Sequence, residues 1–158
     1  MTPRISHAPS LEPATRNLKQ MATVALIDYD HASPEVREVF DDIKRTRDVP
    51  DVNNFWKALA NHPETLKRVW LSLKEVMRPG SLTELEKEMI YLAVSITNNC
   101  DYCIHSHTVS AVNRGMSPAQ YSELIAVVGM AHQTNGLANA MKIPVDEAFL
   151  ATLADLRR

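Results

Sequence analysis

The chain has two cysteines, and they stand three residues apart in the sequence Cys100-Asp-Tyr-Cys103. His107 follows the second cysteine by four residues, so on a helix all three side chains would share one face. Cysteines one helical turn apart can form a disulfide, whose Cα atoms typically lie about 5.5–6 Å apart. The pattern therefore predicts redox chemistry by a dithiol that closes and reopens with little movement of the backbone.

Forming the thiolate is the step in which such a dithiol needs help, because a free cysteine has a pKa of about 8.5 and is mostly protonated at neutral pH. The start of a helix would stabilise an anion at Cys100. His107 could instead take the proton of Cys103 or pair with its thiolate. These effects favour different cysteines. We give Cys103 a slight preference as the nucleophile, since a side chain within reach can act as a base, and leave the choice open.

Glu88 is a further candidate, and it precedes an apolar run over residues 89–94. A carboxyl group on a buried helix has a raised pKa unless it is paired. A raised pKa would suit Glu88 to proton transfer at neutral pH. The competing interpretation is an ordinary solvated acid near a helix start, of which Glu84 and Glu86 are examples.

A zinc site is an alternative use of the same residues, because the two cysteines and His107 are three ligands of a suitable type. Since the chain has no further cysteine, the fourth ligand would have to be Glu88, His105 or His132. A second alternative is a pair of inert, buried cysteines. We favour redox chemistry over both interpretations and therefore expect neither a metal nor another cofactor.

Helical signals follow one another from Ser33 to the end of the chain. Polar capping residues mark helix starts at Ser33, Thr83 and Ser117, and Gly115 marks a helix end. The helices are predicted over residues 33–46, 54–61, 63–78, 83–97 and 100–114, from residue 117, and over residues 144–158. The sequence thus predicts an all-α, compact multi-helix fold in which the cysteines open a central helix. Only residues 23–27 resemble a short strand.

The helix predicted over residues 83–97 is apolar nearly all round from Met89 to Ile96. Such a helix is typically buried, so we expect it at the centre of the fold. Because several other helices are short, we also expect a homo-oligomer that shields this helix.

The composition is that of an ordinary globular protein, with 158 residues, 45% hydrophobic residues and a formal net charge of −2. Neither nucleic acid nor an anionic membrane is expected as a partner, and no apolar run approaches the roughly 18 residues of a membrane span. We expect a flexible arm over residues 1–20 and a single helical domain over residues 21–158, with Met21 as a candidate start. The polar amino-terminal sequence indicates a cytoplasmic protein.

The four candidate residues resemble the motif of the alkylhydroperoxidase AhpD-like proteins, within the carboxymuconolactone decarboxylase superfamily. That motif has a glutamate, a cysteine twelve residues later, and then x-x-Cys-x-x-x-His, which this chain matches from Glu88 to His107. Tyr102, which precedes the second cysteine, also resembles the residue found there in this family. The resemblance covers residues 51–141 well and the chain from Ser33 loosely, but not residues 1–20.

The resemblance implies an all-α fold that assembles as trimers or hexamers, with peroxidase or disulfide-reductase activity. It implies that Cys103 attacks a hydroperoxide and becomes a sulfenic acid, which Cys100 resolves to a disulfide. His107 and Glu88 would relay protons. A thiol reductant, such as a lipoyl group or a thiol protein, would regenerate the enzyme, and a peroxiredoxin would be a partner oxidised upstream.

Two alternatives stand beside this implied function. The related lactone decarboxylases share the fold but do not depend on the cysteine pair, so the presence of Cys100 and Cys103 favours the peroxidase branch. The alternative of a different class is a non-catalytic module that binds zinc or senses oxidation for a partner.

Overall fold

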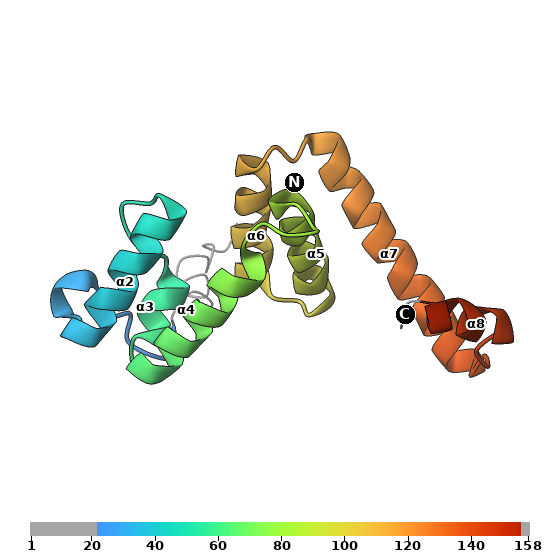
Figure 1. The fold of residues 1–158 in the computed structure, drawn as a ribbon, viewed down its shortest axis with the longest axis horizontal. Helices are drawn as coiled ribbons and strands as arrows, with labels where there is room; N and C mark the ends of the chain where they lie inside the picture. Colours follow the sequence, from blue (N-terminus) through green and yellow to red (C-terminus); the bar gives the residue numbers. More distant parts are fainter. Residues whose placement is uncertain (1–21, 156–158) are drawn as a thin grey trace, which may run out of the picture. The chain divides into compact units, whose positions relative to one another are not determined.

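The computed structural model describes residues 22–155, so the arm predicted over residues 1–20 and the candidate start at Met21 lie outside the described residues. Within that range every regular element is a helix, which confirms the predicted all-α fold (Figure 1). No helix there combines the length and the apolar character needed to cross a bilayer. The elements are the 3₁₀ helix η1 (Tyr29–His31) and the α-helices α2 (Pro34–Arg47), α3 (Asn54–Leu59), α4 (Pro63–Met77), α5 (Glu84–Thr97), α6 (Asp101–Asn113), α7 (Pro118–Met141) and α8 (Glu147–Asp155).

Side chains at the predicted helix starts cap the helices. Ser33 Oγ accepts a hydrogen bond from the Val36 N–H at the start of α2. At α5, Thr83 Oγ1 accepts from the Glu86 N–H, while the Glu86 carboxylate accepts from the Thr83 N–H at 2.6 Å. This capping box satisfies two backbone groups that helix geometry leaves unpaired. Local sequence therefore sets the start of α5, and with it the position of Glu88.

The described chain divides into two compact units, one up to Val76 and one from Met77 onward. In the first unit α2, α3 and α4 enclose a core in which the buried rings of Trp56 and Trp70 meet edge to face, 5.5 Å apart. Hydrogen bonds from the Lys74 ammonium and the Trp70 indole lower the pKa of Asp42 to about 2. Asp42 thereby ties α2 to α4. The single domain expected over residues 21–158 stays a prediction.

Residues 23–27 form no regular element, so the strand interpretation is wrong. The Ile27 N–H donates to the Lys57 carbonyl at 3.1 Å. The side-chain amide of Asn61 donates to the Ala25 carbonyl at 2.7 Å. The backbone of this segment is therefore bonded to the end of α3 and the residues after it, rather than to a neighbouring strand.

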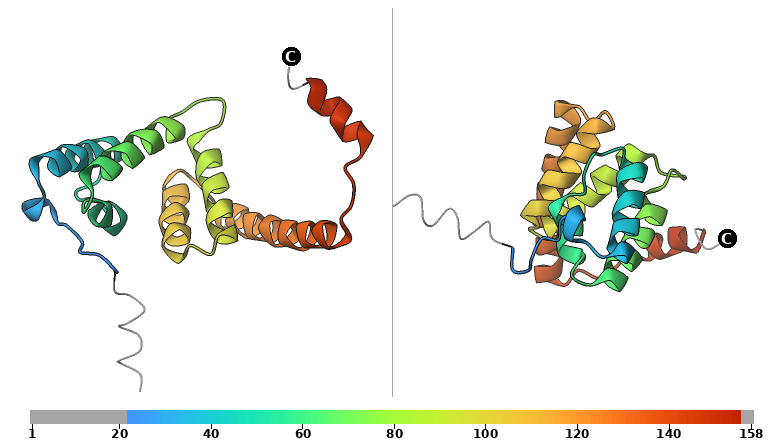
Figure 2. Two further views of the ribbon diagram at one scale, coloured as in Figure 1. Left: turned by 90° about the horizontal axis from the view of Figure 1, so that it is seen from below. Right: turned by 90° about the vertical axis from the view of Figure 1, so that its left-hand side faces the viewer.

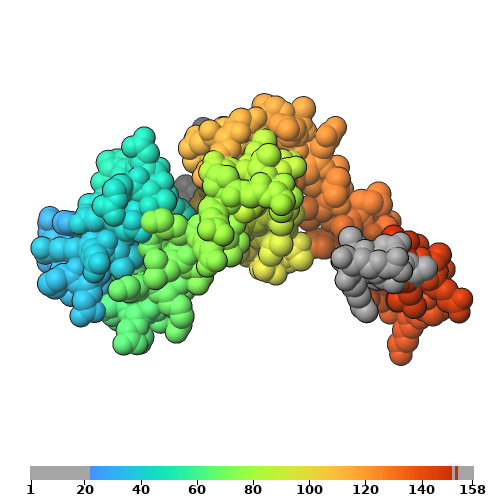
Figure 3. Space-filling model, in the orientation of Figure 1, coloured from blue at the N-terminus to red at the C-terminus, as the bar shows by residue number. Residues whose placement is uncertain are grey.

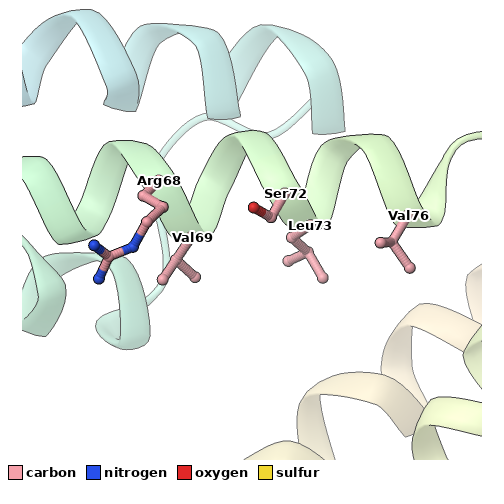
Figure 4. Close-up of a pocket in the computed structure, with 5 residues that line it drawn as sticks. All are labelled: Arg68, Val69, Ser72, Leu73 and Val76. Atoms are coloured by element: carbon pink, nitrogen blue, oxygen red, sulfur yellow. The ribbon is translucent and has the colours of Figure 1, made fainter.

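A shallow hollow lies along one face of α4 in the first unit (Figure 4). Its lining is mostly apolar and consists of Arg68, Val69, Ser72, Leu73 and Val76. These five residues include no cysteine, histidine or carboxylate, and the candidate chemical residues all belong to the second unit. The hollow is therefore not part of the candidate site.

In the second unit α5 and α6 form an antiparallel helical hairpin, joined by residues 98–100 (Figures 1 and 2). α7 packs against this hairpin through its first half. The buried core of the unit consists of Leu92, Ala111, Met116, Leu124 and Val128. The hairpin is the feature that brings side chains of α5 opposite those of α6.

One face of α5 differs from the expected fully buried helix. Glu88, Leu92 and Ser95 are buried, whereas Ile90 and Val94 are 53% and 52% exposed in the single chain. The second half of α7 projects beyond α5 and α6 (Figures 1 and 3). Exposed large apolar side chains of α7, α8 and the segment between them are Ile125, Val127, Met130, Leu137, Met141, Ile143, Val145, Phe149 and Leu150. The expectation of burial on all sides is therefore wrong for the single chain.

Candidate active site

The turn between α5 and α6 places the cysteines at the start of α6. The Cys100 N–H donates to the Ser95 carbonyl at 3.1 Å, and the Asn99 N–H donates to that of Ile96 at the same distance. Asn99 has a left-handed backbone, with a φ of 52°. These bonds and this conformation make up a Schellman motif, and asparagine is one of the residues that tolerates the left-handed region. α5 therefore ends abruptly, and Cys100 at once caps α6.

Cys100 and Cys103 form a disulfide in this structure, with their Cα atoms 5.2 Å apart. Cys100 is the N-cap of α6 rather than a residue of its first turn, and its sulfur accepts the Cys103 N–H at 3.3 Å. Unpaired N–H groups and the positive end of the helix dipole stabilise an anion at such a position. In the reduced protein the Cys100 thiolate would gain this support, whereas His107 lies one turn beyond Cys103 on α6.

Glu88 and His107 meet across the hairpin. The His107 Nδ1 lies 2.7 Å from Glu88 Oε2. Glu88 is only 4% exposed, and its other oxygen, Oε1, accepts from the Ser110 hydroxyl at 2.8 Å. Arg114 Nη1 lies 3.5 Å from the same Oε1. Two residues of α6 and its C-cap Arg114 thus share the two oxygens of one buried carboxylate on α5.

Burial and these partners have opposite effects on the pKa of Glu88. Burial would raise the pKa, but hydrogen bonds from His107 and Ser110 and the charges of His107 and Arg114 outweigh it and hold the pKa below its ordinary value. Glu88 is therefore a carboxylate at neutral pH. The raised pKa expected from sequence is wrong, because it applied to a carboxyl group without a partner.

Tyr91 covers one face of the His107 ring, with the ring centroids 3.7 Å apart and the planes at 20°. Because a carboxylate can only accept, the hydrogen bond to Glu88 places a proton on His107 Nδ1. Within the described residues the other ring nitrogen, Nε2, has no hydrogen-bond partner. A neutral imidazole in this form presents an acceptor at Nε2, which is what a general base requires.

Three residues of this arrangement are not distinguished by sequence alone: Tyr91, Ser110 and Arg114. Helical spacing is the signal that could have found them, since Tyr91 follows Glu88 by three residues, and Ser110 and Arg114 follow His107 by three and seven residues. Spacing does not say which polar side chains of one helix face the neighbouring helix. The pairing of α5 with α6 supplies that information.

The other residues considered as zinc ligands lie elsewhere. His105 is exposed, and its Nδ1 lies 2.7 Å from the Asp101 carbonyl. His132 is exposed on α7. In the part of the chain that the structure describes, no group of three or more His, Cys, Asp or Glu side chains could hold a metal ion. The arrangement of these side chains therefore gives the zinc interpretation no support.

Comparison with known families shows the family to which the chain belongs, and the matched residues include the hairpin of α5 and α6. The sequence model of the carboxymuconolactone decarboxylase family matches residues 63–146, which is 84 of the 158 residues. The chain belongs to this family. Among solved structures it is similar to the crystal structure of the alkylhydroperoxidase AhpD core from Rhodospirillum rubrum, with 56% identity and a TM-score of 0.79. That match covers 82% of this chain and 98% of the other, so the resemblance to AhpD-like members of the carboxymuconolactone decarboxylase superfamily is confirmed.

A more distant similarity connects the chain to an (R)-2-haloacid dehalogenase from Pseudomonas putida, with 26% identity over 105 residues. The match takes in 66% of this family member but 35% of the dehalogenase, so the chain spans about a third of the length of that relative. The cysteine pair and its hairpin are therefore a firmer basis for a functional conclusion than the activity of this longer protein.

Proposed function

We propose that this member of the carboxymuconolactone decarboxylase family is a thiol-dependent, alkylhydroperoxidase-like oxidoreductase that reduces alkyl hydroperoxides or partner disulfides. The observation that carries the proposal is the Cys100–Cys103 disulfide at the start of α6, followed one turn later by His107 in its pair with Glu88. This combines a two-electron redox centre with a proton acceptor, the two functions that peroxide reduction by a thiol requires. Similarity to the AhpD core supports the same activity.

In the oxidative half of the cycle Cys103 is the nucleophile. His107 takes the proton of the Cys103 thiol, and the thiolate attacks the outer oxygen of the hydroperoxide. The O–O bond breaks, the alcohol leaves with the proton returned from His107, and Cys103 becomes a sulfenic acid. The Cys100 thiol then loses its proton and attacks the Cys103 sulfur, which forms the disulfide, and the sulfenic oxygen takes up that proton and leaves as water.

In the reductive half an external dithiol supplies two electrons. One of its thiolates attacks the Cys103 sulfur, and Cys100 leaves as a thiolate that its position at the helix N-terminus stabilises. The second thiol of the reductant then attacks the mixed disulfide and releases Cys103. A lipoyl-type dithiol or a thiol protein fits this step, and a peroxiredoxin fits as the partner whose disulfide the reduced pair would reduce.

Thiol titration tests this proposal on the reduced, metal-free protein, before and after one equivalent of an organic hydroperoxide, with the intact mass measured in parallel. We expect the loss of two thiols and a decrease of about two mass units, because closing a disulfide removes two hydrogens. Protein alkylated beforehand is the control and should not change. Two thiols that survive the peroxide would contradict a redox function.

A lactone decarboxylase-type activity is the second candidate, because the family that matches the chain carries that name. Such an activity would not depend on the cysteine pair. The disulfide at a helix start, one turn before the histidine of a histidine–glutamate pair, favours the peroxidase over this candidate.

We also propose that the protein acts as a homo-oligomer, a trimer or a hexamer. The support is the large apolar surface that α5, α7 and α8 expose in the single chain, including Ile90, Val94 and Phe149. Large apolar side chains exposed in this number are typical of a surface that another chain covers. Light scattering on the eluting chromatographic peak should give three or six chain masses, whereas a single chain mass would contradict the proposal.

A further inference from the structure

We infer that Ser110 and Arg114 are positioning residues that hold the Glu88 carboxylate and, through it, set the proton affinity of His107. The inference rests on the proposed function only for its consequence in catalysis. Its structural content concerns how the buried carboxylate is held, which can be measured whether or not the chain reduces peroxides.

The hydrogen bonds in this group have only one consistent direction. Arg114 Nη1 donates to Ser110 Oγ at 2.8 Å, so the single hydroxyl proton of Ser110 is free to be donated to Glu88 Oε1, also at 2.8 Å. Arg114 is itself anchored, because Nη1 donates to the Ser110 carbonyl at 3.2 Å and Nε lies 3.5 Å from Glu84 Oε2. The chain of contacts therefore runs from Glu84 through Arg114 and Ser110 to Glu88, and ends at His107.

The first consequence is orientation. With Oε1 held by Ser110 and Oε2 bonded to His107 Nδ1, the carboxylate cannot rotate without losing a charge-assisted hydrogen bond. A fixed carboxylate fixes the tautomer of His107, with the proton on Nδ1 and the acceptor at Nε2. Tyr91 holds the ring from one face by stacking.

The second consequence concerns charge. An unassisted carboxylate beside an imidazole favours the protonated ring, and a ring that stays protonated cannot take the proton of a thiol. The Ser110 hydroxyl donates a hydrogen bond to the same carboxylate, and Arg114 places a positive charge near it. Both reduce the electrostatic stabilisation that the carboxylate gives to a protonated His107 ring. Among the described residues, the other titratable groups near the pair are Glu84 and Tyr91 on α5 and the cysteine pair at the start of α6, while the partly buried Tyr121 of α7 packs against the core beside α5 and α6.

Two measurements on one set of variants test this inference. The first is an NMR titration of the His107 imidazole in the reduced protein, which needs no activity. We expect Ser110→Ala and Arg114→Gln to move the midpoint to higher pH by about 0.5–1 unit, since each removes a group that offsets the Glu88 charge. Ser110→Thr keeps the hydroxyl and Arg114→Lys keeps the charge, so both should leave the His107 midpoint close to that of the wild-type protein.

The second measurement is the rate at which a hydroperoxide oxidises the reduced pair, followed from pH 5 to pH 9. The same shift predicts an alkaline displacement of the rising limb and, on the acid side of the midpoint, a rate about 3- to 10-fold lower, because a smaller fraction of His107 is neutral. Ser122→Ala is the matched control, since among the described residues the Ser122 hydroxyl bonds only to the Pro118 carbonyl of its own helix. Thermal unfolding of each variant shows whether the fold is intact.

Each outcome has a distinct meaning. Unchanged His107 midpoints in folded Ser110→Ala and Arg114→Gln proteins would overturn the inference, as would an equal loss of rate at every pH. A wild-type chain that hydroperoxides do not oxidise would instead refute the proposed function, while the NMR titration would still decide whether Ser110 and Arg114 act on His107.

Discussion

Cys103→Ser is expected to reduce hydroperoxide turnover to the background rate, whereas Cys100→Ser is expected to keep one turnover and then stop. Serine at position 103 removes the sulfur that attacks the peroxide. Serine at position 100 leaves that attack possible but removes the thiol that resolves the product, so Cys103 should accumulate as a sulfenic acid. Single-turnover kinetics with a sulfenic-acid-specific probe and intact mass would measure both effects, with one probe adduct on Cys100→Ser and none on Cys103→Ser.

The reverse pattern would exchange the roles of the two cysteines, and the structure gives it a physical basis. Cys100 is the N-cap of α6 and accepts the Cys103 N–H, which lowers the proton affinity of a thiol at that position. A thiolate stabilised in this way is a better leaving group but a weaker nucleophile. For this reason we assign resolution and departure to Cys100, and the first attack to Cys103 beside its histidine base.

Glu88→Gln is expected to lower the rate of peroxide reduction about 10²- to 10³-fold, a loss within the range seen when a proton-transfer group is disabled. The substitution keeps the size of the side chain but removes the charge that His107 Nδ1 contacts at 2.7 Å. Without that charge the imidazole is less readily protonated, so the rising limb of the pH–rate profile should move to lower pH. This direction is opposite to the one expected for Ser110→Ala.

His107→Ala removes the base itself. Its rate at neutral pH should fall about 10²- to 10⁴-fold, and the activity that is left should rise only above about pH 8, where the thiol ionises without help. Glu123→Gln, an exposed carboxylate of α7, is the control for loss of one negative charge and should leave the profile unchanged. Near-normal rates in folded Glu88→Gln and His107→Ala proteins would refute the proton relay.

The sequence predicts the helices well because their boundaries are local. Thr83 and Glu86 make both bonds of a capping box, and Gly115, with a φ of 93°, follows the last residues of α6. These features involve residues that are neighbours in the chain, so no knowledge of tertiary structure is needed. The cysteine–histidine spacing is local in the same sense, and one helix start and one further turn carry all three residues.

What sequence could not predict depends on contacts between helices. The shift in the pKa of Glu88 is opposite in direction to the one expected for an unpaired acid because His107 and Ser110 of α6, together with its C-cap Arg114, contact the carboxylate. Their orientation follows from how α5 and α6 pair. Likewise Ile90 and Val94 look like core residues by composition, but only one face of α5 is covered within the described chain. Both differences depend on which face of one helix packs against another helix.

The short span of the Cys100–Cys103 disulfide limits how much its oxidation restricts the unfolded chain. The bond closes a loop of four residues, from Cys100 to Cys103, and a loop of that size restricts the unfolded chain by only about 2 kcal/mol, against about 4.7 kcal/mol for a loop of 100 residues. Meanwhile the backbone hydrogen bonds to Ser95 and Ile96 shape the same turn without using either sulfur. Under the proposed redox function, opening the bond would therefore restore less than half of the chain entropy that a disulfide across a loop of about 100 residues restricts, and the backbone hydrogen bonds of the turn would not depend on whether the sulfurs are bonded.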